Sequence, residues 1–171
     1  MEHALLQQLR QRPLLCDGAM GSLLYARGIT HEQCFDALNL TQPELIAGIH
    51  REYINAGAQI IETNSFGANR AKLEAYDMAE QVRAINRSAA RLAREAREVS
   101  GQPVYIAGAV GPSGRPLQAP DASRLSELRR IFREQIEALQ DGGADLLILE
   151  TFSNLPELRQ VEGLVERPDV R

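Results

Sequence analysis

The sequence has few cysteines and no long apolar run. Only Cys16 and Cys34 are cysteines, too few for a disulfide framework, so we expect two free thiols in a reducing compartment. Nowhere do about 18 apolar residues run together, and the amino-terminal residues lack the charged start and apolar stretch of a signal peptide. The sequence therefore predicts a cytoplasmic protein without a membrane span.

An excess of basic charge is also missing. The formal net charge is -4 and the isoelectric point is about 5.5, which disfavours nucleic acid and anionic membranes as partners. Apolar residues make up 44% and charged residues 25% of the 171 residues, ordinary values for a globular protein. A chain of this length is expected to form one domain with a buried core.

Short apolar runs alternate with amphipathic stretches along the chain. Buried strands are predicted at 13–16, 59–62, 103–109 and 145–150, because apolar residues there are not alternated with polar ones. Helices are predicted at 43–56, 79–99, 123–140 and 156–165, where apolar residues recur three and four apart. Strict alternation of strand and helix implies a parallel sheet and an α/β fold.

The connections that follow the strands are longer than those that precede them. Loops are expected at 17–42, 64–77 and 111–122, whereas the return before residue 59 is short. Enlarged loops at the carboxyl ends of parallel strands are where α/β proteins build binding sites.

Two of these strand ends carry the same pattern. GAQIIETNSFG at 57–67 and GADLLILETFS at 143–153 both place Glu-Thr after an apolar run. Because a strand buried on both faces cannot hold an unpaired carboxylate along its length at low cost, Glu62 and Glu150 are expected to open onto one shared site.

The loop after the first predicted strand bears on the type of sheet. It reads DGAMGS at 17–22, which lacks the G-x-G-x-x-G pattern of a dinucleotide-binding fold. The long units favour a (β/α)8 barrel, which needs about 250 residues and eight strands. We therefore interpret residues 1–171 as a single partial domain, the amino-terminal half of a barrel with about four βα units. Its open sheet edges predict homo-oligomerisation or coverage by the remainder of the barrel.

Four motifs resemble a known family. They are LLCDGAMGSLLYARGI, CFDALNLTQPELIAGIHREYINAGAQIIETNSFGANRAKL, AGAVGPSG and GADLLILETFSNLPEL, and together they resemble the homocysteine S-methyltransferase domain. That domain occurs in cobalamin-dependent methionine synthase and fused to methylenetetrahydrofolate reductase in bifunctional bacterial enzymes. The resemblance extends from about residue 11 to about residue 160.

The resemblance implies a barrel enzyme that transfers a methyl group to the zinc-activated thiol of homocysteine and so forms methionine. It implies methyltetrahydrofolate or another compound as methyl donor. The family's zinc ligands are three cysteines from the carboxyl half of the barrel, and no cysteine follows Cys34 here. We therefore expect no metal ligand and no catalytic residue in this segment, which alone should be inactive.

The positions that match the family in this half belong to amino-acid recognition. By resemblance, the substrate-binding residues are predicted to be Asp17, Gly18, Ser22, Thr63, Asn64, Ser65 and Glu150. Glu150 is expected to pair with the substrate ammonium, and the Thr63–Ser65 stretch to bind the carboxylate. Glu62 is the more ambiguous glutamate of the pair, and Thr63 suits a purely structural role in a strand equally well.

Two other hypotheses stay open at the level of sequence. The first is a catalytically inactive half-barrel fragment that oligomerises and at most binds an amino acid. The second is a phosphate-binding barrel of another kind, whose glycine-rich anion loop would come late in the barrel.

Overall fold

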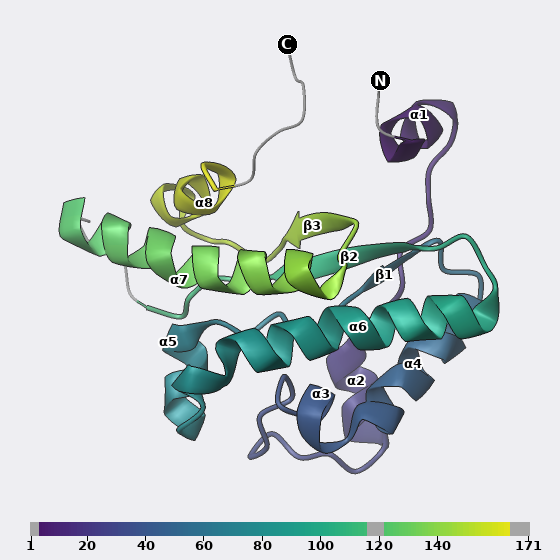
Figure 1. Cartoon of the computed structure of the whole chain (residues 1–171), viewed down its shortest axis with the longest axis horizontal. Helices are drawn as coiled ribbons and strands as arrows, with labels where there is room; N and C mark the ends of the chain where they lie inside the picture. The colour runs from purple at the N-terminus through teal and green to yellow at the C-terminus, as the bar shows by residue number, and fades with distance from the viewer. Residues whose placement is uncertain (1–3, 116–121, 165–171) are drawn as a thin grey trace.

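A computed structural model of the protein describes residues 4–115 and 122–164. Its centre is a parallel sheet of three strands in the order β1 (Ile60–Glu62), β2 (Tyr105–Val110) and β3 (Leu146–Leu149) (Figure 1). Glu62 lies beside Ala107, and Ala109 lies beside Ile148. The predicted α/β fold with a parallel sheet is therefore confirmed.

The first predicted strand, 13–16, is not a full strand. Only Cys16 pairs with the sheet, through one parallel bridge to Ile60. The Leu15 carbonyl accepts hydrogen bonds from both Gln59 and Ile60, at 2.8 and 3.1 Å, and the Asp17 N–H donates to the Ile60 carbonyl at 2.9 Å. Pro13 has no N–H to extend this ladder. The prediction of four strands was wrong in this detail, although the segment lies next to β1.

Four helices correspond to the predicted ones: the long helices α4 (Pro43–Asn55), α6 (Val82–Ser100) and α7 (Ala122–Gly142), and the shorter α8 (Leu155–Glu162). The predicted start of α6 at residue 79 is instead a 3-10 turn, η2 (Ala79–Gln81). The end of the last predicted helix, residue 165, lies outside the described residues.

Several short elements occupy segments expected to be irregular. They are α1 (Ala4–Gln11), α2 (Met20–Ala26), α3 (Leu38–Thr41), α5 (Arg70–Leu73) and the 3-10 turn η1 (Glu74–Tyr76). Helices of four to eight residues carry too few turns to show a clear period, so these helices are stabilised by tertiary packing.

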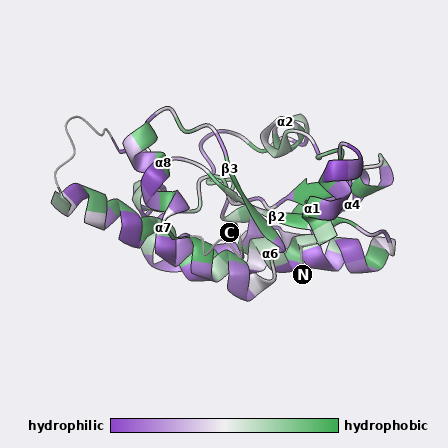
Figure 2. Ribbon diagram, turned by 90° about the horizontal axis from the view of Figure 1, so that it is seen from above, coloured by the Kyte–Doolittle hydropathy of each residue, from purple (hydrophilic) through white to green (hydrophobic). Residues whose placement is uncertain are grey.

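The two faces of the sheet have different surroundings. Ile61 and Ile106 point to one face and pack with Ile54 of α4 and Ala93 of α6. The alternate residues Ile60 and Ala107 form another cluster with Leu5, packed by Leu14, Tyr105, Leu146 and Ile148. In Figure 2 the strands are mostly green, whereas α6 and α7 show purple residues along one side of the molecule. Helices α4 and α6 thus pack on one face, Leu5 of α1 lies against the other, and the carboxyl ends of the strands are left to the loops.

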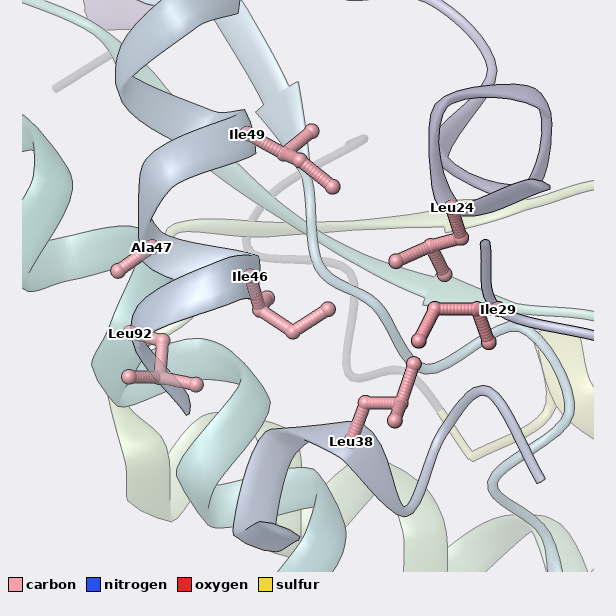
Figure 3. Packing of buried hydrophobic residues seen from close by; sticks show 7 residues of the cluster. All are labelled: Leu24, Ile29, Leu38, Ile46, Ala47, Ile49 and Leu92. Atoms are coloured by element: carbon pink, nitrogen blue, oxygen red, sulfur yellow. The ribbon is translucent and has the colours of Figure 1, made fainter. Parts of the chain in front are cut away.

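The long loop between Asp17 and α4 is anchored by its own core. Leu24 of α2, Ile29, Leu38 of α3 and Ile46 of α4 are all buried, and their side chains point toward one another (Figure 3). Burying each such side chain stabilises the fold by about 1.5 to 3 kcal/mol. This cluster holds α2 and α3 over the sheet and so places the wall of the site.

None of the helices built from residues 4–115 and 122–164 has both the length and the apolarity that crossing a lipid bilayer requires. Within the same residues β3 pairs only with β2, so its other edge is open.

Candidate functional site

A cavity of about 890 Å³ lies at the carboxyl ends of the strands. Its wall includes six of the seven predicted site residues: Asp17, Gly18, Thr63, Asn64, Ser65 and Glu150. The loop anchored by α2 and α3 forms one side of the cavity, and the residues that follow β1 and β3 form the other. The seventh residue, Ser22, is exposed on α2 and is not part of the wall.

Asp17 is fixed at the first strand end by the backbone of β1. Its Oδ2 accepts a 2.9 Å hydrogen bond from the Glu62 N–H, which extends the pairing beyond Cys16. The pKa of Asp17 is raised to about 6, because burial, with a smaller contribution from the nearby Glu150 carboxylate, outweighs the lowering effect of hydrogen bonds from the backbone.

Glu62 joins Asp17 and Glu150 in one acidic group. Alternate residues of a strand face the same side, so Glu62 of β1 and Glu150 after β3 both face the side on which β2 presents the small Ala107 and Ala109. The pKa of Glu62 is raised to about 7, chiefly by burial and in addition by repulsion from Glu150 and Asp17. No arginine or lysine in the described part of the chain forms an ion pair with these three carboxylates.

Packing accounts for the glycine at position 18 as well as contact with a ligand would. A Cβ at this position would lie 2.9 Å from the Tyr53 hydroxyl, closer than real Cβ contacts. That hydroxyl donates a 3.3 Å hydrogen bond to the Ala19 carbonyl. The absence of a side chain at Gly18 therefore lets Tyr53 of α4 hold the loop in place.

The hydroxyls of Thr63 and Ser65 bind the neighbouring strand. The Ala109 N–H donates to Thr63 Oγ1 at 3.0 Å, the two hydroxyls are 2.6 Å apart, and Ser65 Oγ donates to the Ala109 carbonyl at 2.8 Å. Since Ser65 gives its proton to Ala109, Thr63 gives its proton to Ser65. Both hydroxyl protons are thus used within the protein.

The side chain of Asn64 is also fixed. Its side-chain amide nitrogen donates to the Phe35 carbonyl at 2.7 Å, and the backbone carbonyl of Asn64 accepts from the Asn39 side chain at 2.6 Å. The backbone N–H groups of Asn64 and Phe66 make no hydrogen bond to any other described residue. The turn therefore offers backbone donors rather than side-chain donors.

A second charged group, which no pattern in the sequence indicated, lies on the cavity wall. Asp36 accepts a 3.0 Å hydrogen bond from the Gly67 N–H, and its pKa is raised to about 6 because burial outweighs the lowering effects of that bond and of Lys72. Lys72 and Phe66 complete this part of the wall. Asp36 and Lys72 are far apart in the sequence, Asp36 in the turn before α3 and Lys72 in the short helix α5, so no periodic signal linked them.

The residues present do not fit a thiolate-rich metal site. Both cysteines are free; Cys16 is exposed and outside the cavity wall, whereas Cys34 is buried on it. Burial raises the pKa of both thiols, which disfavours the thiolate that binds metal. Across residues 4–115 and 122–164, no group of three or more His, Cys, Asp or Glu side chains is arranged to hold a metal ion.

The parallel α/β fold carries an acidic cavity at the carboxyl ends of its strands. The family model for homocysteine S-methyltransferase matches residues 14–170. The chain therefore belongs to the homocysteine S-methyltransferase family, and the resemblance seen in its motifs is confirmed.

Similar proteins are longer than this chain. Methionine synthase of Mycobacterium tuberculosis is 35% identical over 164 residues, which cover 91% of this chain and 14% of that protein. Methionine synthase of Mycobacterium leprae is 34% identical over 164 residues, with the same coverage. The crystal structure of the homocysteine methyltransferase MmuM from Escherichia coli in its oxidized form has a TM-score of 0.83 and 33% identity, covering 95% of this chain and 61% of MmuM. Its metallated form has a TM-score of 0.82 and 32% identity, covering 95% and 62%.

Proposed function

We propose that the chain belongs to an enzyme that methylates the thiol of homocysteine to form methionine, and that this segment recognises the amino acid. The observation that supports the proposal most is the meeting of three carboxyls on one cavity: Asp17 after the bridge at Cys16, Glu62 at the end of β1 and Glu150 after β3. In such a reaction the sulfur loses its proton and bonds to the methyl carbon, while the bond from that carbon to the donor breaks.

The acidic group suits a primary ammonium ligand. Three carboxyls that repel one another in a partly buried site leave a cation as their best counter-charge. An ammonium presents three N–H donors, one for each carboxyl. Binding such a ligand would lower the pKa values of Asp17 and Glu62 again, because an opposite charge favours the ionised form.

The described residues are assigned binding and orientation only. Asp17 and Glu150 would bind the ammonium, with Glu62 beside them, and the turn from Thr63 to Ser65 would offer its backbone N–H groups to the ligand. Gly18, which has no side chain, would keep the loop that begins at Asp17 close to Tyr53 of α4. No thiol-activating step is assigned to these residues, since across the described part of the chain no three His, Cys, Asp or Glu side chains are arranged to hold a metal ion.

Binding of substrate fragments tests the proposal. The purified chain is titrated calorimetrically, under reducing conditions, with L-homocysteine and with 4-mercaptobutanoic acid, which lacks only the amino group. The Glu150→Gln variant removes a charge at the site, and Glu98→Gln removes one from an exposed glutamate of α6 that pairs with Arg94.

The expected result is that L-homocysteine binds about tenfold or more tightly than 4-mercaptobutanoic acid, as lost charge-assisted hydrogen bonds imply. Glu150→Gln should reduce that preference, and Glu98→Gln should leave it unchanged. Equal affinity for the two compounds, or no effect of Glu150→Gln, would rule out ammonium recognition at this site.

A further inference from the structure

The cavity wall contains the only lysine of the chain. Of its 19 basic residues, Lys72 alone is not an arginine, and it is the only lysine or arginine among the described residues that form the wall. An ammonium is a compact, mobile point charge, whereas a guanidinium needs a planar, bidentate partner. A single lysine placed here in an arginine-rich chain is therefore a feature to explain.

Lys72 is held in place by its stem and not by a counter-ion. Its Nζ lies 4.3 Å from the centroid of the Phe66 ring. The ring fits there because residue 111 is glycine, whose Cβ would lie 2.3 Å from Phe66 Cε2. Gly67 and Gly114 come within ordinary contact distance of the lysine stem, at 3.6 and 3.5 Å from a Cβ built on each.

The Lys72 ammonium has no acceptor within the described structure. No hydrogen bond or ion pair is formed by its Nζ. The adjacent Arg70, in contrast, binds Glu134 at 2.9 Å and Glu80 at 2.5 Å. A half-buried ammonium that has only an aromatic face as partner is left with unsatisfied N–H donors.

The charged residues that act on Lys72 include Glu150 of the acidic group. Burial lowers the pKa of Lys72, while Asp36, Glu157 and Glu150 raise it. The charge of Lys72 is thus within electrostatic reach of Glu150 across the cavity, although the two form no ion pair. Glu157 is occupied by Ser113, whose N–H and hydroxyl donate to its Oε1 at 2.8 and 2.6 Å, and Asp36 accepts from Gly67.

A free amino acid carries an anion next to its ammonium. The hydroxyl protons of Thr63 and Ser65 are both donated within the protein. These two side chains therefore have no proton to donate to the carboxylate of the ligand, and neither carries a charge to pair with it. The free N–H groups of Asn64 and Phe66 lie in the same stretch of chain as the ring that supports Lys72.

We propose that Lys72 is a substrate-binding residue that pairs with the α-carboxylate of the amino acid whose ammonium binds Asp17 and Glu150. The inference rests on the proposed function, because it needs an amino acid in this cavity. It makes the site selective for zwitterions: a ligand must present both charges on one carbon to satisfy both groups.

Paired ligands and variants separate this role from a structural one. The first ligand is L-homocysteine, and the second is 3-mercaptopropylamine, which lacks only the carboxylate. Lys72→Met removes the charge and keeps much of the stem, and Lys72→Arg keeps the charge. Affinities are measured by calorimetry, and thermal unfolding of each variant reports whether the fold is intact.

Lys72→Met is expected to weaken the binding of L-homocysteine by about 10- to 100-fold, the range of a charged hydrogen bond. The affinity for 3-mercaptopropylamine should stay unchanged. Lys72→Arg should recover part of the lost affinity. If Lys72 only offsets the charge of Asp36, Lys72→Met will instead lower the thermal stability and weaken both ligands equally, which overturns the proposal.

The lone lysine also gives a direct spectroscopic readout. Protein labelled with [13Cε]lysine has one side-chain signal, so its pH titration reports Lys72 alone. L-homocysteine should shift this signal and raise the pKa of Lys72, because a carboxylate favours the ammonium, whereas 3-mercaptopropylamine should not. An identical response to both ligands would contradict carboxylate pairing.

The proposed function and this inference fail in different ways. If Glu150→Gln weakens both amines but Lys72→Met affects neither, ammonium recognition stands and the role of Lys72 is overturned. If Glu150→Gln has no effect, or if the unaltered chain binds neither ligand, the proposed function fails and the assignment of Lys72 fails with it.

Discussion

The backbone N–H of Glu62 donates a 2.9 Å hydrogen bond to Oδ2 of Asp17. This bond joins two members of the acidic group through the main chain, so the carboxylates are held together by the sheet itself. The Asp17 N–H in turn donates to the Ile60 carbonyl. The site is therefore built before any ligand binds, at a cost in electrostatic repulsion.

Glu62→Gln is expected to stabilise the ligand-free protein at neutral pH. The pKa of Glu62 is raised to about 7 from an ordinary 4.5, so the folded state holds its proton more tightly than the unfolded state does. This contribution is complete below pH 4.5 and is lost as pH rises through 7. Allowing for solvent at this half-buried site, the variant should gain about 1 to 2 kcal/mol near pH 8.

Urea unfolding of both proteins between pH 5 and pH 8 measures this difference. The stability of the variant relative to the parent should rise with pH across that window. Glu98→Gln, on the exposed side of α6, provides the control and should show no such trend. A constant difference at every pH would mean that ionisation of Glu62 is not the cause.

The placing of the two glutamates could be predicted from the sequence because it depends on local pattern. Apolar runs separated by amphipathic helices give parallel strands, and parallel strands bring their carboxyl ends to one edge. Glu62 and Glu150 follow from this rule. The conformations of the two threonines that follow these glutamates cannot be predicted in this way. Thr63 accepts a hydrogen bond from Ala109 of β2, whereas Thr151 has a φ of 61°. Only tertiary contacts decide between these conformations.

The wall of the cavity that contains Asp36 and Lys72 could not be predicted from such local patterns. Asp36 joins Lys72 of α5 on the cavity wall because Leu24 and Leu38 pack onto Ile46 and so place the long loop that carries Asp36. Short helices in that loop have no clear period, so neither their position nor their charged residues can be inferred from spacing.

Thr63→Val should destabilise the fold by about 1 to 3 kcal/mol. Valine has nearly the same shape, but the buried Ala109 N–H would lose the acceptor that Thr63 Oγ1 provides at 3.0 Å. Thr41→Val is a suitable control, since its hydroxyl donates to a carbonyl of its own helical turn at 3.2 Å. Urea unfolding checks the expectation. Loss of ligand affinity at unchanged stability would instead assign the Thr63 hydroxyl to the substrate.

His50→Leu should remove a dependence of stability on acid pH. His50 is fully buried in α4 and neither ring nitrogen has a hydrogen-bond partner in the described structure. Burial lowers its pKa from 6.5 to about 4, so between these values the unfolded state binds a proton that the folded state does not. Stability therefore falls as pH drops from about 6.5 to 4, by about 3 kcal/mol for this group.

The carboxyls of Asp17, Asp36 and Glu62 titrate in the opposite sense over part of the same range. For this reason the relevant quantity is the difference between variant and parent, measured by urea unfolding at pH 4.5, 5.5 and 7. The advantage of His50→Leu should grow toward acid pH. An advantage that is the same at all three values would show that packing, and not protonation, is what changed.

Thr151→Asn is expected to raise stability by about 1 kcal/mol. Thr151 follows Glu150 directly and has a φ of 61°, a left-handed conformation that costs about 1 to 2 kcal/mol for most residues and more for a β-branched one. Asparagine accepts this conformation more readily, so the backbone that directs Glu150 into the cavity is kept. Thermal unfolding should show the gain, and L-homocysteine affinity should be unchanged. Thr151→Val retains the β-branch and should show no gain; stabilisation by valine as well would attribute the effect to the hydroxyl and exclude backbone strain.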